Sequence, residues 1–122
     1  MDMSKYIGLP YERVDCWDLA KMFYRDNYSI DLSQVFDGVG PEDSQEREIL
    51  IKSKKGVFDV VGKPLIGDLV VIKLNGFESH VGIYAGLNRV LHSLKGVGVI
   101  CDNLNRYKHL VSGYYRHREL ND

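Results

Sequence analysis

Long hydrophobic runs are absent from this sequence of 122 residues. No apolar segment approaches the roughly 20 residues that are needed to span a bilayer. The first residues, Met1 to Lys5, also lack the apolar centre of a signal peptide. We therefore expect synthesis in the cytoplasm without a signal peptide and no membrane partner. Any target outside the cell would then be reached by lysis, by a secretion machine or within a larger particle.

A strong net charge is absent as well. The 16 basic and 17 acidic residues are mixed along the chain and give a formal net charge of -1. Nucleic-acid binding normally requires a basic stripe, so we expect no nucleic-acid partner. The sequence also has no glycine-rich phosphate loop, internal repeat or linker, and its length and 44% hydrophobic content suit a single domain over residues 1–122.

Cysteine is scarce, since Cys16 and Cys101 are the two in the chain. In a chain without an export signal, a disulfide between them has little support, and free thiols are expected. The cysteines and the four histidines are separated by long stretches, without the close pairs that are typical of zinc sites. We therefore expect no metal and no cofactor.

Helical periodicity is clearest near the N-terminus. Apolar and aromatic residues recur there at helical spacing: Leu19, Ala20, Met22, Phe23 and Tyr24. Asp15 precedes them as an N-cap, so the pattern predicts a helix from about Asp15 to Tyr28 with Cys16 in its first turn. A second helix is predicted from Pro41 to about Lys54.

The second half of the chain has the character of β-structure. The predicted strands are Gly67–Lys73, Ser79–Ala85, Arg89–Ser93, Gly96–Asp102 and Val111–Arg118. Asn75-Gly76 predicts a hairpin turn, whereas the stretch from Gly56 to Gly62 is ambiguous. Because helices come first and strands follow, we predict an α+β domain in which N-terminal helices pack on a central antiparallel sheet of about five strands.

The position of Cys16 at a helix start suggests chemistry. Unpaired N–H groups and the helix dipole favour the thiolate, which is the nucleophilic form of cysteine. A buried thiol that packs as a small hydrophobe is an equally open alternative. Cys101 ends an apolar strand without such activation, so we expect an unreactive, packed thiol.

Two histidines fall on neighbouring predicted strands. His80 lies near the beginning of the strand Ser79–Ala85, and His92 lies in the strand Arg89–Ser93. Cross-strand neighbours lie about 4.5 to 5.5 Å apart at Cβ, so His92 is placed to orient His80. A nucleophile, a base and a third polar group make up the triad arrangement, although a lone histidine satisfied at a strand edge is the commoner case.

Alternation along the strand separates its two faces. His80, Gly82 and Tyr84 share one face, and Val81, Ile83 and Ala85 share the other, which we expect to face the core. The remaining histidines, His109 and His117, lie in polar surroundings and are expected at the surface.

Five segments carry a resemblance to a known family. They are Tyr6-Ile7-Gly8-Leu9-Pro10-Tyr11, Asp15-Cys16, Gly67-Asp68-Leu69-Val70, His80-Val81-Gly82-Ile83-Tyr84 and Leu91-His92. Their order and spacing resemble those of the NlpC family of papain-like cysteine peptidases. The resemblance implies a papain-like fold in which Cys16 attacks a peptide carbonyl, His80 takes and returns the proton, and His92 is the third polar residue.

The resemblance also implies residues for an oxyanion and substrate region. Tyr11 matches the family's tyrosine near the oxyanion site, with an aromatic lid over the helix as the alternative, and Asp15 belongs to the same region. The backbone N–H of Cys16 or Trp17 would supply another donor. Asp18 departs from the small residue usual in the family, which leaves the shape of the substrate groove open.

Members of this family usually cleave peptidoglycan stem peptides, often between D-γ-glutamyl and diaminopimelyl or lysyl residues. The resemblance therefore implies a peptidoglycan peptide as substrate. The Asp15-Cys16-Trp17 start and the Tyr24-Arg25 pair are most similar to phage tail-associated members, which implies virion proteins as partners and a location in the virion or at the cell wall. Two alternatives stay open: an inactive structural or plug component of a phage tail, and a papain-like acyltransferase, for which no membrane-facing segment is apparent.

Overall fold

A computed structural model describes residues 2–33, 57–74 and 77–120. The helices are α1 (Cys16–Tyr28) and the 3-10 turns η1 (Leu104–Tyr107) and η2 (Arg118–Leu120). The strands are β1 (Phe58–Val61), β2 (Leu69–Leu74), β3 (Phe77–Gly86), β4 (Arg89–Leu94), β5 (Gly98–Asn103) and β6 (Val111–His117). Within the described ranges, no helix is long and apolar enough to cross a bilayer.

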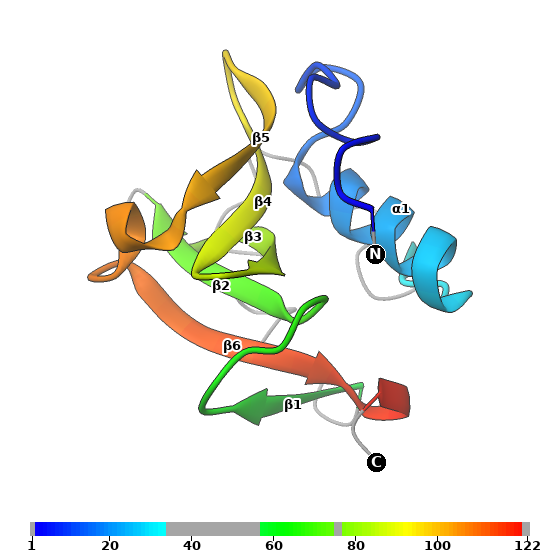
Figure 1. The fold of residues 1–122 in the computed structure, drawn as a ribbon, viewed down its shortest axis with the longest axis vertical. Helices are drawn as coiled ribbons and strands as arrows, with labels where there is room; N and C mark the ends of the chain where they lie inside the picture. Colours follow the sequence, from blue (N-terminus) through cyan, green and yellow to red (C-terminus); the bar gives the residue numbers. More distant parts are fainter. Residues whose placement is uncertain (1, 34–56, 75–76, 121–122) are drawn as a thin grey trace.

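The strands form one antiparallel sheet in the order β1-β6-β2-β3-β4-β5. Helix α1 lies beside β3 and β4, and β1 and β6 extend the sheet at the end opposite β5 (Figure 1). The predicted α+β architecture is therefore confirmed. Five of the six strands coincide with predicted strands to within two residues at each end.

The sheet has six strands, one more than the predicted number of about five, and the strand that the sequence did not predict is β1. It is only four residues long, and all four pair with β6, more than 50 residues later in the chain. Such pairing leaves no local signal in the sequence.

The pairing of β1 with β6 also corrects the expectation that His117 lies at the surface. His117 is 9% exposed, with its ring centroid 5.3 Å from that of Phe58 and 6.3 Å from that of Tyr24.

Helix α1 begins where the sequence predicts, because Asp15 and Asp18 form a capping box. The Asp15 carboxylate accepts the N–H groups of Trp17 at 3.0 Å and Asp18 at 2.9 Å, and the Asp18 carboxylate accepts the Asp15 N–H at 3.2 Å. The helix ends at Tyr28, and its C-cap residue Ser29 adopts a left-handed conformation (φ 56°). The second predicted helix, Pro41–Lys54, and the predicted turn at Asn75-Gly76 lie outside the described residues.

Buried apolar clusters lie on both faces of the central strands of the sheet. Leu19 and Phe23 of α1 pack in one cluster with Val81, Ile83 and Leu91, which confirms that the odd-numbered face of β3 points to this core. The opposite face carries a second cluster, which the sequence did not predict: Val70, Ile72, Val90 and Leu104. Polar side chains in the middle of β4, such as His92 and Ser93, are therefore enclosed.

The Gly67-Asp68 segment has a structural role at the entrance to β2. Asp68 is buried and accepts hydrogen bonds from Arg116 at 2.8 Å and from the Leu65 N–H at 2.7 Å. Gly67 has a φ of +97°, and a Cβ atom there would collide with the hydroxyl of Tyr28. Glycine is required at this turn, and the ion pair fixes β2 against β6.

Candidate active site

Cys16 is the first residue of α1 and is 3% exposed. Its predicted place in the first turn of a helix is confirmed. The N-terminal N–H groups of a helix carry partial positive charge, which favours a thiolate at this position. Both cysteines are free thiols, and Cys101 packs half-buried against the core cluster of α1.

Asp15 and Trp17 flank Cys16 and have structural contacts. The carboxylate of Asp15 is engaged by the capping bonds, and the Trp17 N–H is one of the donors to it. The Trp17 side chain is buried in the core. The Trp17 N–H therefore belongs to the helix cap.

His80 and His92 are brought together between β3 and β4. The Nε2 atom of His80 lies 2.9 Å from Nδ1 of His92, and both rings are buried, His80 at 6% exposure and His92 completely. If the register of Ile83 opposite Leu91 is continued, Gly82 lies opposite His92, so the two histidines meet on a diagonal. The missing side chain at Gly82 leaves room for this contact, since a Cβ atom there would lie 3.2 Å from the Cβ of His92.

Burial sets the charge of His92. Desolvation lowers the pKa of this histidine, and the nearby Asp102 carboxylate opposes the shift without cancelling it. His92 is therefore neutral near pH 7, with a proton on one nitrogen only. A neutral imidazole donates one hydrogen bond and accepts another, as an orienting partner for His80 requires.

Asp102 is a site residue that the sequence analysis missed. Its Oδ2 atom lies 3.5 Å from Nε2 of His92 and accepts the hydroxyl of Tyr107 at 2.8 Å. The 3.5 Å separation is long for a hydrogen bond, and His92 Nε2 has no hydrogen-bonding partner among the described residues, so we treat the contact as electrostatic. The sequence has no local signal for this residue, because its place opposite Val90 is known only from the register of the paired strands β4 and β5.

Ser93, the neighbour of His92, connects the histidine strands to the start of α1. Its buried hydroxyl donates to the carbonyl of Val14, two residues before Cys16. Helix α1 packs against β3 and β4, which carry the two histidines. The element that begins with Cys16 is thus held against the strands of His80 and His92 by apolar packing and by this hydrogen bond.

Comparisons with known proteins identify the family and the fold of the chain. The model of the NlpC/P60 family matches residues 5–116. The chain belongs to the NlpC/P60 family. Its structure is similar to the crystal structure of the NlpC/p60 domain of the peptidoglycan hydrolase SagA, with a TM-score of 0.63 and 20% identity over 93% of this chain and 91% of that chain. At this identity the likeness concerns the fold. No curated protein matches the sequence significantly.

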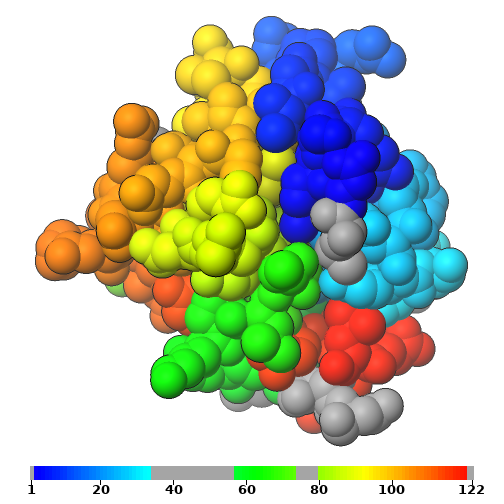
Figure 2. Space-filling model, viewed as in Figure 1, coloured from blue at the N-terminus to red at the C-terminus, as the bar shows by residue number. Residues whose placement is uncertain are grey.

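Tyr11, the residue that resembles the NlpC/P60 oxyanion tyrosine, lies half-buried in a turn directly before α1. The N–H groups of Arg13 and Val14 bond to the carbonyl of Pro10 and form this turn. Upstream, Gly8 and Leu9 exchange backbone hydrogen bonds with Val99 of β5, and this N-terminal segment lies between the β4–β5 hairpin and α1 (Figure 2). Backbone hydrogen bonds therefore fix the chain both before and after Tyr11.

The departure of this chain from the usual NlpC/P60 pattern at Asp18 has a local explanation. Asp18 occupies the third position of α1 and completes the capping box with Asp15. Burial raises the pKa of its carboxyl group, and the nearby Asp15 charge adds to this effect.

Among the described residues, no group of three or more histidine, cysteine or acidic side chains is arranged to hold a metal ion.

Proposed function

We propose that this chain is a cysteine peptidase of bacterial peptidoglycan, with Cys16 as nucleophile, His80 as base and His92 as the residue that orients the base. The observation that carries the proposal is the buried contact of 2.9 Å between His80 Nε2 and His92 Nδ1. A base held in this way through Nε2 keeps Nδ1 for the exchange of a proton with the thiol.

The reaction begins when His80 takes the thiol proton and the Cys16 thiolate attacks the carbonyl carbon of the scissile peptide bond. The oxyanion that forms is stabilised by the Cys16 N–H at the helix start and by the hydroxyl of Tyr11. The C–N bond then breaks, and His80 returns the proton to the leaving amine. Water, deprotonated by His80, hydrolyses the thioester and restores the thiol.

The proposed substrate is the stem peptide of peptidoglycan, cleaved between D-γ-glutamyl and diaminopimelyl residues. Membership of the NlpC/P60 family and the fold shared with a domain of a peptidoglycan hydrolase support this substrate class. The Asp15-Cys16-Trp17 start, similar to phage tail-associated members, supports a role in a virion that delivers the domain to the cell wall.

Digestion of purified sacculi, followed by mass spectrometry of the released fragments, tests the proposal and names the bond. We expect cleavage by the wild type and by Cys101→Ala, and none by Cys16→Ala. His80→Ala should lose activity about as completely, because members of a triad act as a unit. Fragments that carry a new acyl acceptor instead of a free carboxylate would indicate an acyltransferase. The absence of cleavage over a range of pH and wall types would refute the peptidase.

Thiol reactivity separates an enzyme from an inactive structural component of a virion. An activated Cys16 should react with iodoacetamide near neutral pH much faster than Cys101, which provides an internal control in the same chain. His80→Ala should slow the alkylation of Cys16 and leave that of Cys101 unchanged. Equal, slow rates at the two thiols would favour the structural component.

A further inference from the structure

A buried carboxylate lies behind the histidine pair, on the side away from α1. Asp102 is the penultimate residue of β5 and its side chain is 9% exposed, with its Oδ2 atom 3.5 Å from Nε2 of His92. His92 is thus enclosed between two polar groups, His80 at Nδ1 and Asp102 at Nε2. Asp102 is not a member of the proposed triad.

The aspartate is itself held by several neighbours. The Tyr107 hydroxyl donates to Oδ2 at 2.8 Å, the Asn103 N–H donates to Oδ1 at 2.9 Å, and Arg106 Nε lies 3.5 Å from Oδ1. Burial alone would raise the pKa of Asp102, but these donors and His92 outweigh it and lower the pKa below its ordinary value. Asp102 is therefore ionised at neutral pH.

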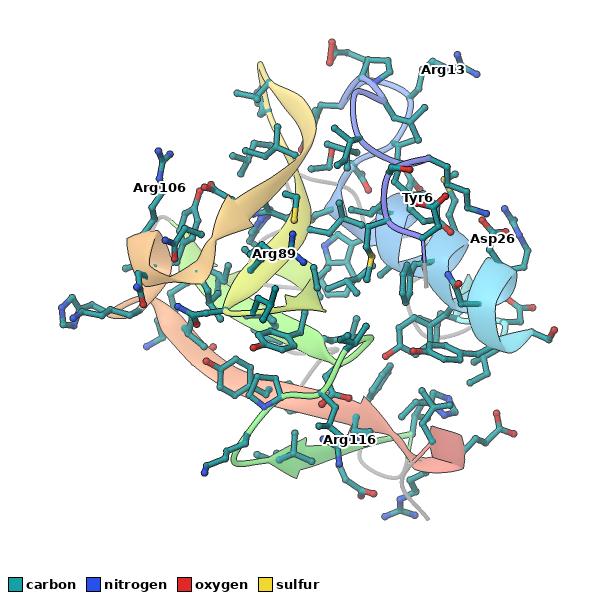
Figure 3. The ribbon with its side chains drawn as sticks, viewed as in Figure 1. Tyr6, Arg13, Asp26, Arg89, Arg106 and Arg116 are labelled. Carbon is teal, nitrogen blue, oxygen red and sulfur yellow. The ribbon has the colours of Figure 1, made fainter. Side chains whose placement is uncertain are left out.

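Tyr107 and Arg106 approach from the turn η1. The Tyr107 ring packs edge-on against His92, with ring centroids 5.2 Å apart. Tyr107 therefore contacts both His92 and Asp102. Arg106 extends from η1 towards solvent (Figure 3). The titratable and charged groups that face Asp102 among the described residues are therefore His92, Tyr107 and Arg106.

The order of these groups determines where each proton lies. A carboxylate has no proton to donate, so the nitrogen of His92 that faces it is the one that gains from carrying hydrogen. With its proton on Nε2, His92 presents Nδ1 as an acceptor, and His80 must then donate its own Nε2–H to it. Nδ1 of His80 is left unprotonated, which is the state that a base needs.

We propose that Asp102 is a positioning residue that fixes the proton of His92 on Nε2 and thereby holds His80 in the tautomer that accepts the thiol proton. This inference extends the proposed function and rests on it for its catalytic consequence. The negative charge of Asp102 also stabilises positive charge on the histidine pair, and with it the thiolate of Cys16.

The first test is the tautomer of His92 in the wild-type protein, measured by two-bond ¹H–¹⁵N correlation spectra with ¹⁵N-histidine. The chain has four histidines, and His92→Gln assigns the signal. We expect hydrogen on Nε2 and none on Nδ1 at pH 7. Hydrogen on Nδ1 would overturn the inference whether or not the chain proves to be a peptidase.

The second test uses Asp102→Asn and Asp102→Ala. We expect kcat to fall roughly 10- to 100-fold, by analogy with the loss of a partner that orients a metal-bound histidine, while KM changes little. The pH at which Cys16 reaches half of its maximal alkylation rate should move upward, because the thiolate loses indirect stabilisation. Tyr107→Phe keeps the ring on His92 and removes one donor, so a smaller loss is expected.

Asp26→Asn is the matched control. Asp26 Oδ2 accepts the Tyr6 hydroxyl at 2.8 Å, the same kind of bond as that between Tyr107 and Asp102, and the pair lies on the other side of the molecule from Arg106 (Figure 3). We expect its kcat and alkylation profile to match the wild type. If both Asp102 variants keep the wild-type kcat, alkylation profile and His92 tautomer, the inference is wrong.

Failure of the proposed function gives a different result. A wild type that cleaves no peptidoglycan but shows His92 protonated on Nε2, with the tautomer lost in Asp102→Ala, would refute the peptidase and support the positioning role. An active wild type in which the His92 tautomer does not depend on Asp102 would support the peptidase and refute the positioning role.

Discussion

The hydroxyl of Ser93 donates a buried hydrogen bond to the carbonyl of Val14, 79 residues earlier in the chain. One end of this bond is next to His92 on β4, and the other lies two residues before Cys16. The segment before Cys16 and the strand of His92 are therefore joined by a buried polar contact in addition to apolar packing. Such a contact can affect activity more than stability, because it fixes the position of one half relative to the other.

Ser93→Ala tests this connection. The variant leaves the Val14 carbonyl without its buried donor, which should lower the free energy of unfolding by about 1 to 3 kcal/mol. We expect kcat to fall as well, because the start of α1 is no longer fixed to β4. Urea denaturation and peptidoglycan cleavage measure the two effects. Ser112→Ala is the control, since Ser112 makes the same type of bond, to the Val71 carbonyl on β2, away from α1. An equal loss of kcat in both variants would contradict the connection.

Gly82→Ala tests the space that permits the histidine contact. A Cβ atom at Gly82 would lie 2.5 Å from Cγ2 of Val90 and 3.2 Å from Cβ of His92, so the strands must shift. Overpacking of this kind typically costs about 1 to 3 kcal/mol. We expect a loss of both stability and activity, whereas Gly62→Ala, where a Cβ atom meets nothing within 4 Å, should resemble the wild type. Full activity in Gly82→Ala would show that the diagonal contact tolerates displacement.

Asp15 has two candidate roles, as helix cap and as part of the substrate region, and two substitutions separate them. Asparagine caps helices about as well as aspartate, so Asp15→Asn should keep the stability, while Asp15→Ala should lose about 1 kcal/mol. If the cap is the whole role, the asparagine variant also keeps KM for wall peptides. A raised KM in Asp15→Asn with unchanged thermal stability would instead assign the carboxylate to substrate binding.

The sequence was sufficient to predict those elements whose signal is local. Asp15 before an apolar helical pattern located the start of α1, and strand periodicity located β2 to β6. The pairing of His80 with His92 followed from their positions on successive strands. In each case a few neighbouring residues carry the information, because helix caps, alternation and tight turns are properties of short segments.

The features that escaped prediction depend on contacts between distant segments. β1 exists because β6 pairs with it, and the same pairing buries His117. Asp102 stands at a strand end, where an aspartate usually faces solvent, and only the packing of η1 on the second face of the sheet encloses it. The register that places Gly82, instead of His80, opposite His92 likewise requires the paired strands.

Two buried histidines make stability depend on pH in a defined direction. Burial lowers the pKa of His92, against the opposing effect of Asp102, and it lowers the pKa of His117, against that of Glu119. Near the ordinary histidine value of about 6.5, the unfolded chain therefore binds more protons than the folded chain. The free energy of unfolding should fall as the pH drops through this value, until the folded histidines are themselves protonated.

Urea titrations between pH 8 and pH 5, as an experimental range spanning the ordinary histidine pKa of about 6.5, measure this dependence. Each histidine contributes a slope of at most about 1.4 kcal/mol per pH unit. His117→Gln should reduce the slope and leave catalysis intact, because its ring packs against Tyr24 and Phe58 away from the histidine pair. His109→Gln, which replaces an exposed histidine, is the control variant. If the free energy of unfolding of His117→Gln falls more steeply with decreasing pH than that of the wild type, this ring is charged in the folded chain. The assignment of His117 as a buried neutral group would then be wrong.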